Sequence, residues 1–350
     1  MASVSSIQIG DHKIGNDARP IVIAEVAQAH DGSLGTAHAF IDAIADAGAD
    51  AVKFQTHIAA AESTRSEPWR VKFSKQDVTR YDYWKRMEFT ESQWAGLKEH
   101  ANNRGLIFLS SPFSPEAVGL LHRIGVPAWK VASGEITNLP LLKLMLDTKL
   151  PVLLSSGMST TEDLDNAVQT CRAANAQIGV FQCTTLYPCP PEKIGLNLIA
   201  TLGERYHCPV GLSDHSGKIF ACLAATTLGA AMLELHVTFS RQMFGPDVPA
   251  SVTFPELKQL TDGAADIHKM RTALVEKNAI AAEMATMKGI FQKSIVARHS
   301  LKKGSVLSEA DLALKKAGGG LPPERLDSVV GRKLARDVEA DTALADSDLS

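Results

Sequence analysis

The sequence predicts an α/β fold, a (β/α)8 TIM barrel followed by a small β-rich domain. Eight short apolar runs alternate with segments of helical periodicity between residues 21 and 278, which suits a barrel of roughly 250 residues. The runs are apolar at nearly every position, as parallel strands buried on both faces must be. No glycine-rich dinucleotide fingerprint follows any of them, which favours a closed barrel over an open doubly wound sheet.

The strands are expected where the chain is most continuously apolar. In order, they are residues 21–27, 51–56, 107–112, 128–133, 151–156, 178–184, 209–215 and 231–238. Several intervening segments begin with Ser, Thr, Pro or Glu and end at Gly or Asn, the residues that commonly cap helices. A last helix is predicted at residues 255–278, after the eighth strand.

The pattern changes towards the C-terminus. Two segments, 297–312 and 335–349, resemble one another, and each indicates strand, turn, strand and a short acidic end. We therefore expect two domains, residues 1–284 and residues 285–350. Within the barrel, the connection 57–91 is unusually long, basic and aromatic; it is either a solvated excursion or a flap over the barrel mouth.

Composition excludes several classes of partner. The 350 residues carry a net charge of -3 with a pI near 6.4, which does not suggest binding to nucleic acid or to an anionic membrane. No apolar run reaches the roughly 18 residues that would span a bilayer. The five cysteines show no CxxC spacing, so we expect reduced thiols in a cytoplasmic protein.

Polar side chains gather at the C-terminal ends of the predicted strands, where barrels of this kind build their active sites. They are Glu25, Lys53, Ser111, Lys130, Ser133, Glu135, Ser155, Thr185, Tyr187, Ser213, His215, Glu234 and His236. Any one of them could belong to an ion-pair network that only fills the barrel, but the set as a whole indicates a site. Asp214 is expected to cap the turn that follows its strand.

Two kinds of ligand suit this set. The lysines and hydroxyls indicate an anion, either phosphate or carboxylate. His215 and His236 end consecutive strands, and two neutral imidazoles with oxygen ligands can hold a divalent cation. A lone histidine at a strand end is more often a hydrogen-bonded core residue. The prediction of a metal site therefore depends on the two histidines ending consecutive strands.

Short motifs along the chain resemble those of the sialic acid synthase family. They are AEVAQAHDG, KFQTH, FLSSPFS, WKVASGE, LSSGM, QCTTLYP, GLSDHS, LELHVT and GPD, in this order. The family includes N-acetylneuraminate, legionaminate and pseudaminate synthases and spore-coat polysaccharide synthesis proteins. The resemblance runs from about residue 7 to the C-terminus, where the small domain is similar to the antifreeze-like (SAF) domain of these synthases.

The resemblance implies a reaction and a set of roles. The family condenses phosphoenolpyruvate with an N-acylated hexosamine to a nine-carbon 2-keto acid and releases phosphate. It implies that Mn²⁺ or Mg²⁺ is held by His215 and His236, and that Glu135 lies near the reacting enol carbon. Phosphoenolpyruvate would be held by Lys53, Ser111, Lys130, Ser133, Ser155 and Ser213. Glu25, Tyr187 and Asp247 would face the sugar, in a homodimer whose C-terminal domain covers the partner's barrel.

Three departures leave the amino sugar open. Ala29 and Thr185 each replace an asparagine of the family pattern, and Lys316 stands where an arginine usually reaches the N-acyl group. Lys316 offers a point charge without the bidentate fork of arginine. Two other functions also stay open: a Schiff-base aldolase that uses Lys53 or Lys130, and a non-catalytic sugar-binding homologue.

Overall fold

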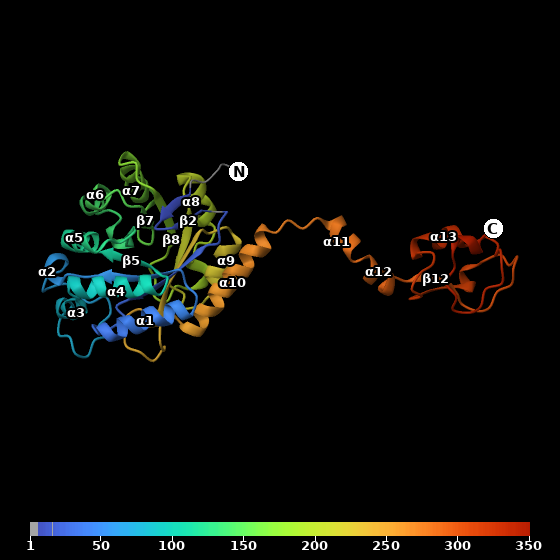
Figure 1. Ribbon diagram of the computed structural model, residues 1–350, viewed down its shortest axis with the longest axis horizontal. Helices are drawn as coiled ribbons and strands as arrows, with labels where there is room; N and C mark the ends of the chain where they lie inside the picture. Colours follow the sequence, from blue (N-terminus) through green and yellow to red (C-terminus); the bar gives the residue numbers. More distant parts are fainter. Residues whose placement is uncertain (1–5, 16) are drawn as a thin grey trace. The chain divides into compact units, whose positions relative to one another are not determined.

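The computed structural model describes residues 6–15 and 17–350 (Figure 1). The chain divides into two compact units, Met1–Thr272 and Ala273–Ser350, and each is described by itself. In the described part of the chain, no helix is long and apolar enough to cross a membrane.

The first unit is the predicted barrel. Its parallel strands are β3 (Ile21–Ala27), β4 (Ala51–Thr56), β5 (Ile107–Pro112), β6 (Trp129–Val131), β7 (Val152–Ser155), β8 (Ile178–Cys183), β9 (Val210–Asp214) and β10 (Met232–Thr238). They are hydrogen-bonded in the order β5-β4-β3-β10-β9-β8-β7-β6, and β5 also lies beside β6. All eight predicted strands are thus confirmed; three have the predicted ends, and the ends of the other five differ by at most two residues.

Helices surround the strands (Figure 1). They are α1 (Leu34–Asp46), α4 (Glu91–Asn103), α5 (Pro115–Ile124), α6 (Leu139–Asp147), α7 (Thr161–Ala173), α8 (Leu198–Tyr206), α9 (Phe220–Thr227) and α10 (Phe254–Thr272). The expected caps explain several starts; the Thr90 and Thr160 side chains, for example, form capping boxes with the third residue of α4 and α7. Helix α10 ends at Thr272, so the prediction that it continues to residue 278 was wrong.

The interior of the barrel differs between its two ends. At the N-terminal end, Ile23, Leu109, Leu153 and Phe181 form an apolar cluster with a hairpin of β1 (Ile7–Ile9) and β2 (His12–Ile14). The sequence did not predict this hairpin, because its two strands have only three residues each. Since this end is filled by apolar side chains, the polar side chains of the strands are left to the C-terminal end.

The segment 57–91 connects β4 to α4 and has secondary structure of its own. It holds α2 (Ala59–Glu62) and α3 (Arg80–Met87), and a cluster of aromatic rings. The Arg86 guanidinium of α3 pairs with Asp77 and Asp31 at 2.7 Å each, which ties the segment to the loop after β3. A short strand, β11 (Ser251–Thr253), adds to the sheet beside β10.

The second unit has its own small core. It contains α11 (Lys277–Glu283), α12 (Ala285–Phe291), the antiparallel pair β12 (Ser294–Ala297) and β13 (Leu312–Lys315), and α13 (Leu326–Val329). Ile295, Leu307, Val338 and Leu344 lie at its centre and are fully buried or nearly so. The resemblance between the two segments of the C-terminal domain is structural as well, because short 3-10 turns occur at Glu309–Asp311 and Asp346–Asp348.

Candidate active site

A cavity of about 390 Å³ opens at the C-terminal end of the barrel strands, and every strand of the barrel contributes to its wall. Its lining includes these residues singled out from the sequence: Glu25, Lys53, Ser111, Lys130, Ser133, Glu135, Ser155, Thr185, Tyr187, Ser213, His215, His236 and Asp247. The segment 57–91 adds Trp69, Arg70 and Trp84, as the flap interpretation predicts. The strand ends therefore meet at one site, and the long connection forms part of its rim.

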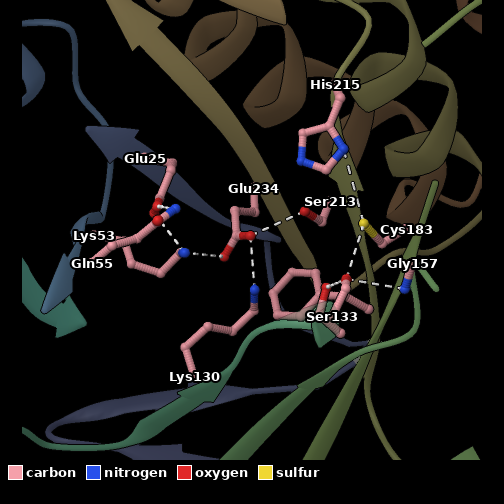
Figure 2. A network of polar contacts seen from close by, with 12 residues as sticks. Glu25, Lys53, Gln55, Lys130, Ser133, Gly157, Cys183, Ser213, His215 and Glu234 are labelled. Atoms are coloured by element: carbon pink, nitrogen blue, oxygen red, sulfur yellow. Dashed lines mark hydrogen bonds and ion pairs between the residues drawn. The ribbon is translucent and has the colours of Figure 1, made fainter. Parts of the chain in front are cut away.

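Two lysines and two glutamates form a buried cluster on the wall of the cavity (Figure 2). The Lys53 ammonium lies 2.6 Å from Glu25 Oε2, and the Lys130 ammonium lies 2.8 Å from Glu234 Oε1. Lys53 is also 3.7 Å from Glu234 Oε2, so the two pairs are linked. With all four groups ionised, two cations balance two anions, which is how buried charges can be tolerated. Burial nevertheless raises the pKa of Glu25 despite the opposing charge of Lys53.

Glu234 lines the cavity, although from the sequence it had no predicted role beyond a place among the strand-end residues. Its carboxylate lies between both lysines and also accepts a hydrogen bond from Ser213 Oγ at 3.0 Å. Burial raises the pKa of Glu234, but Lys130 and Lys53 more than offset this and lower it to about 2. The available signal was a glutamate in the middle of the apolar run MLELHVT, which requires a compensating cation.

Hydroxyl groups lie around a second part of the wall. Ser133 Oγ donates to Ser155 Oγ at 3.2 Å and accepts from the Gly157 N–H at 3.1 Å. Among the described residues, the buried hydroxyls of Ser111 and Thr185 have no hydrogen-bond partner. Because a buried hydroxyl without a partner is costly, these two groups are suited to a ligand in the cavity.

Gly157 is needed for this close packing of hydroxyls. A Cβ atom at this position would lie 2.2 Å from Thr185 Oγ1 and 2.6 Å from Ser133 Oγ. No side chain could be accommodated there without moving the hydroxyls.

The two histidines lie together, as the sequence predicts. Their ring centroids are 5.3 Å apart. His215 Nδ1 donates to the Thr184 carbonyl at 3.0 Å, so in the neutral ring Nε2 carries the lone pair, which accepts from the Tyr187 hydroxyl at 3.0 Å. Burial lowers the pKa of His215, but the neighbouring Cys183 and the Thr184 carbonyl more than offset this and raise it. Burial lowers the pKa of His236 to about 3, so this imidazole is neutral at pH 7. The described residues contain no group of three or more His, Cys, Asp or Glu side chains that could hold a metal.

Acidic side chains and one arginine lie nearer the rim. Glu135 accepts from the Asn138 amide at 2.8 Å. Arg70, which the sequence reasoning did not single out as a site residue, pairs with Asp247 at 2.9 Å, and its guanidinium carbon lies 4.5 Å from the centroid of the Tyr187 ring. The only sequence signal for Arg70 was the basic character of the segment 57–91.

Asp214 and Lys316 are not among the residues that line the cavity. Asp214 accepts from the Ser216 N–H and hydroxyl at 3.1 and 2.7 Å, which confirms that it caps the turn after β9. Lys316 belongs to the second unit, where its ammonium lies 5.0 Å from the centroid of the Phe291 ring. Its predicted contact with the sugar stays a prediction.

Comparison with known proteins connects this site to a family. The model of the NeuB family matches residues 40–276, and that of the SAF domain matches residues 292–350. The chain is 33% identical to the N,N'-diacetyllegionaminic acid synthase of Campylobacter jejuni, over 92% of this chain and 98% of that protein. It is 30% identical to the human N-acetylneuraminate-9-phosphate synthase, over 95% of this chain and 93% of that protein.

A solved structure gives the same result. The N-acetylneuraminic acid synthetase of Leptospira borgpetersenii, crystallised with citrate, superposes with a TM-score of 0.71 at 29% identity, over 82% of this chain and 98% of that one. The relatives named here are synthases, and their similarity extends over nearly the whole chain. The chain therefore belongs to the NeuB family, with a SAF domain at its C-terminus.

Proposed function

We propose that this chain condenses phosphoenolpyruvate with the open-chain form of an N-acylated hexosamine to a nine-carbon 2-keto acid, with release of phosphate. The observation that carries the proposal is the cavity itself: buried lysines and unpartnered hydroxyls lie in the same cavity as a pair of histidines. The relatives named above, which are synthases of nine-carbon sugar acids or of a phosphate of one, support the same reaction.

The lysine cluster and the hydroxyls are suited to phosphoenolpyruvate. Lys53 and Lys130 supply positive charge, while Ser111, Ser133, Ser155, Thr185 and Ser213 supply hydrogen bonds. A phosphate and a carboxylate on a small molecule need both kinds of group. Because Glu25 and Glu234 already balance the lysines, the hydroxyls carry a large share of this binding.

We further propose that His215 and His236 hold Mn²⁺ or Mg²⁺, with oxygen atoms of water and substrate as the other ligands. The donor set fits once both rings are neutral, because two neutral imidazoles with oxygen ligands suit such an ion. His236 is neutral at pH 7, and Nε2 of His215 can exchange its hydrogen bond with the Tyr187 hydroxyl for the ion. When bound, the ion supplies a Lewis acid that polarises the aldehyde oxygen of the sugar.

The chain's own residues then direct the bond changes. The electron pair of the C2=C3 double bond of phosphoenolpyruvate forms the bond from carbon 3 to the aldehyde carbon, and the aldehyde oxygen takes up a proton to become a hydroxyl. Water adds at carbon 2, and Glu135 takes one of its protons. The new hydroxyl at carbon 2 then loses its other proton as the bond between carbon 2 and the phosphate oxygen breaks, so a ketone forms and phosphate leaves with this oxygen and the proton. Glu25, Tyr187 and Asp247 orient the sugar hydroxyls, and Lys316 of a partner subunit contacts the N-acyl group in a homodimer.

Phosphate release tests this proposal. The protein is incubated with phosphoenolpyruvate, Mn²⁺ and a panel of N-acylated hexosamines with and without a 6-phosphate, and inorganic phosphate is measured. We expect release with at least one sugar, and none when the sugar or the metal is left out. If no member of the panel releases phosphate, the synthase proposal is wrong.

One observation favours the aldolase alternative and gives it a separate test. Burial and the neighbouring Lys53 lower the pKa of Lys130 despite the opposing charge of Glu234, and an amine with a low pKa can form an imine. Treatment with borohydride and pyruvate separates the two functions: covalent labelling of Lys130 would support the aldolase, while a synthase stays unlabelled and active.

A further inference from the structure

His57 directly follows β4, and the proposed reaction assigns it no role. Its imidazole is buried between two rings, with the Trp84 centroid 4.1 Å away on one side and the Phe113 centroid 4.5 Å away on the other. The plane of the His57 ring makes an angle of 19° with that of Trp84 and of 10° with that of Phe113, so the three rings are stacked. Trp84 belongs to α3 in the segment 57–91, while Phe113 directly follows β5.

Hydrogen bonds join His57 to Glu25 through two amides. His57 Nδ1 lies 2.6 Å from Glu62 Oε1, and His57 Nε2 lies 2.7 Å from the amide nitrogen of Gln28. The Gln28 amide nitrogen also donates to Gln55 Oε1 at 2.7 Å. The Gln55 amide in turn donates to Glu25 Oε1 at 2.9 Å.

The direction of every bond in this chain is fixed by its two ends. Glu25 accepts from the Gln55 nitrogen, so the Gln55 oxygen faces Gln28 and accepts from the Gln28 nitrogen. That nitrogen can only donate, so His57 Nε2 accepts from it at 2.7 Å. His57 Nε2 also lies 3.3 Å from the Gln55 oxygen, but two acceptors cannot bond to each other, so the shorter contact decides the tautomer. The imidazole proton is then on Nδ1 and is donated to the Glu62 carboxylate.

We propose that His57 is a positioning residue. It fixes the side-chain amides of Gln28 and Gln55, so that the Gln55 amide nitrogen donates to the Glu25 carboxylate and holds it towards the sugar. This inference rests on the proposed function, in which Glu25 faces the sugar hydroxyls. Glu62 selects the tautomer of His57, and the ring stack with Trp84 makes the arrangement depend on the segment 57–91. The sugar half of the site is thereby coupled to the fold of its rim.

Two substitutions separate this role from simple packing. His57→Gln places an amide oxygen near the former Nε2 and can still accept from Gln28, whereas His57→Asn reaches only the position of Nδ1 and leaves Gln28 without an acceptor. Both remove the aromatic ring. We expect His57→Asn to raise the KM for the sugar about fivefold to tenfold, as loss of a buried hydrogen bond does, with a smaller change in the KM for phosphoenolpyruvate.

The same assay defines what would overturn the inference. His57→Gln should retain a KM for the sugar closer to that of the wild type, and the same two substitutions at the exposed His122 should leave both constants unchanged. Equal losses in His57→Gln and His57→Asn would make His57 a packing residue only. Wild-type kinetics in His57→Asn would likewise overturn the inference.

A second measurement does not depend on activity or on the stability of the variants. The ¹⁵N spectrum of histidine-labelled wild-type protein, with the His57 signals identified by sequential assignment, reports the tautomer. We expect a neutral ring protonated at Nδ1. A ring protonated at Nε2 would contradict the hydrogen-bond chain, even if no sugar released phosphate and the proposed function itself had failed.

Discussion

Glu234 lies between two buried lysines, and its carboxylate forms an ion pair with Lys130 at 2.8 Å. We expect Glu234→Gln to destabilise the protein by roughly 3–5 kcal/mol at pH 7, because it removes one partner from a buried ion pair. Denaturant unfolding at pH 7 measures this effect, and an unchanged free energy of unfolding would contradict the prediction.

The same residue gives a dependence on pH. The pKa of Glu234 is lowered from 4.5 to about 2 in the folded protein, so its stabilising contribution is present above pH 4.5 and is lost as the pH falls towards 2. The difference in unfolding free energy between the wild type and Glu234→Gln should therefore shrink over this range. A difference that stays constant down to pH 2 would show that the lysines do not hold this carboxylate ionised.

At the scale of elements, Arg70 makes one of the contacts between the segment 57–91 and the rest of the site. The pair with Asp247 is partly exposed, with the Arg70 side chain 43% accessible, so it contributes about 1 kcal/mol or less to stability. Its position over Tyr187 nevertheless fixes two side chains that we assign to the sugar.

We therefore expect Arg70→Ala to raise the KM for the sugar severalfold while the free energy of unfolding changes little. Arg65→Ala is a matched control, because Arg65 lies in the same segment but stacks on Tyr81 rather than lining the cavity. If the two variants behave alike in steady-state kinetics, the contact between Arg70 and Asp247 has no part in sugar binding.

Strands and helices were the features that local sequence predicted best. The apolar runs that form β3 to β10 and the Thr and Ser caps of the helices act within a few residues, so a single sequence displays them. The hairpin of β1 and β2 escaped prediction because Ile7, Ile9 and Ile14 become informative only once they close the bottom of the barrel. The predicted length of α10 was too great because the residues after Thr272 include no glycine or proline that would mark the end of the helix.

At the scale of the whole molecule, the two units have separate cores, so the barrel should fold without the SAF domain. We expect a chain that ends at Thr272 to keep the circular dichroism and cooperative unfolding of a barrel but to lose condensation, because Lys316 is missing. In the full chain, Lys316→Ala should weaken sugar binding, whereas Lys315→Ala, which removes a surface pair with Asp341, should not. Full turnover by the shortened chain would contradict a role for the C-terminal domain in the site.

The sequence by itself determined the barrel, the order of its strands, the repeat in the C-terminal domain and the gathering of polar side chains at one end of the sheet. These follow from periodicity and from the rule that parallel strands end at the same edge. Only the tertiary structure decided which polar groups meet. Lys130 and Glu234 are 104 residues apart, and Arg70 and Asp247 are 177 apart, so closure of the barrel and folding of the segment 57–91 bring them together. The direction of the hydrogen bonds from Glu62 to Glu25 depends on those distant contacts, because each group can donate or accept only as its neighbours allow.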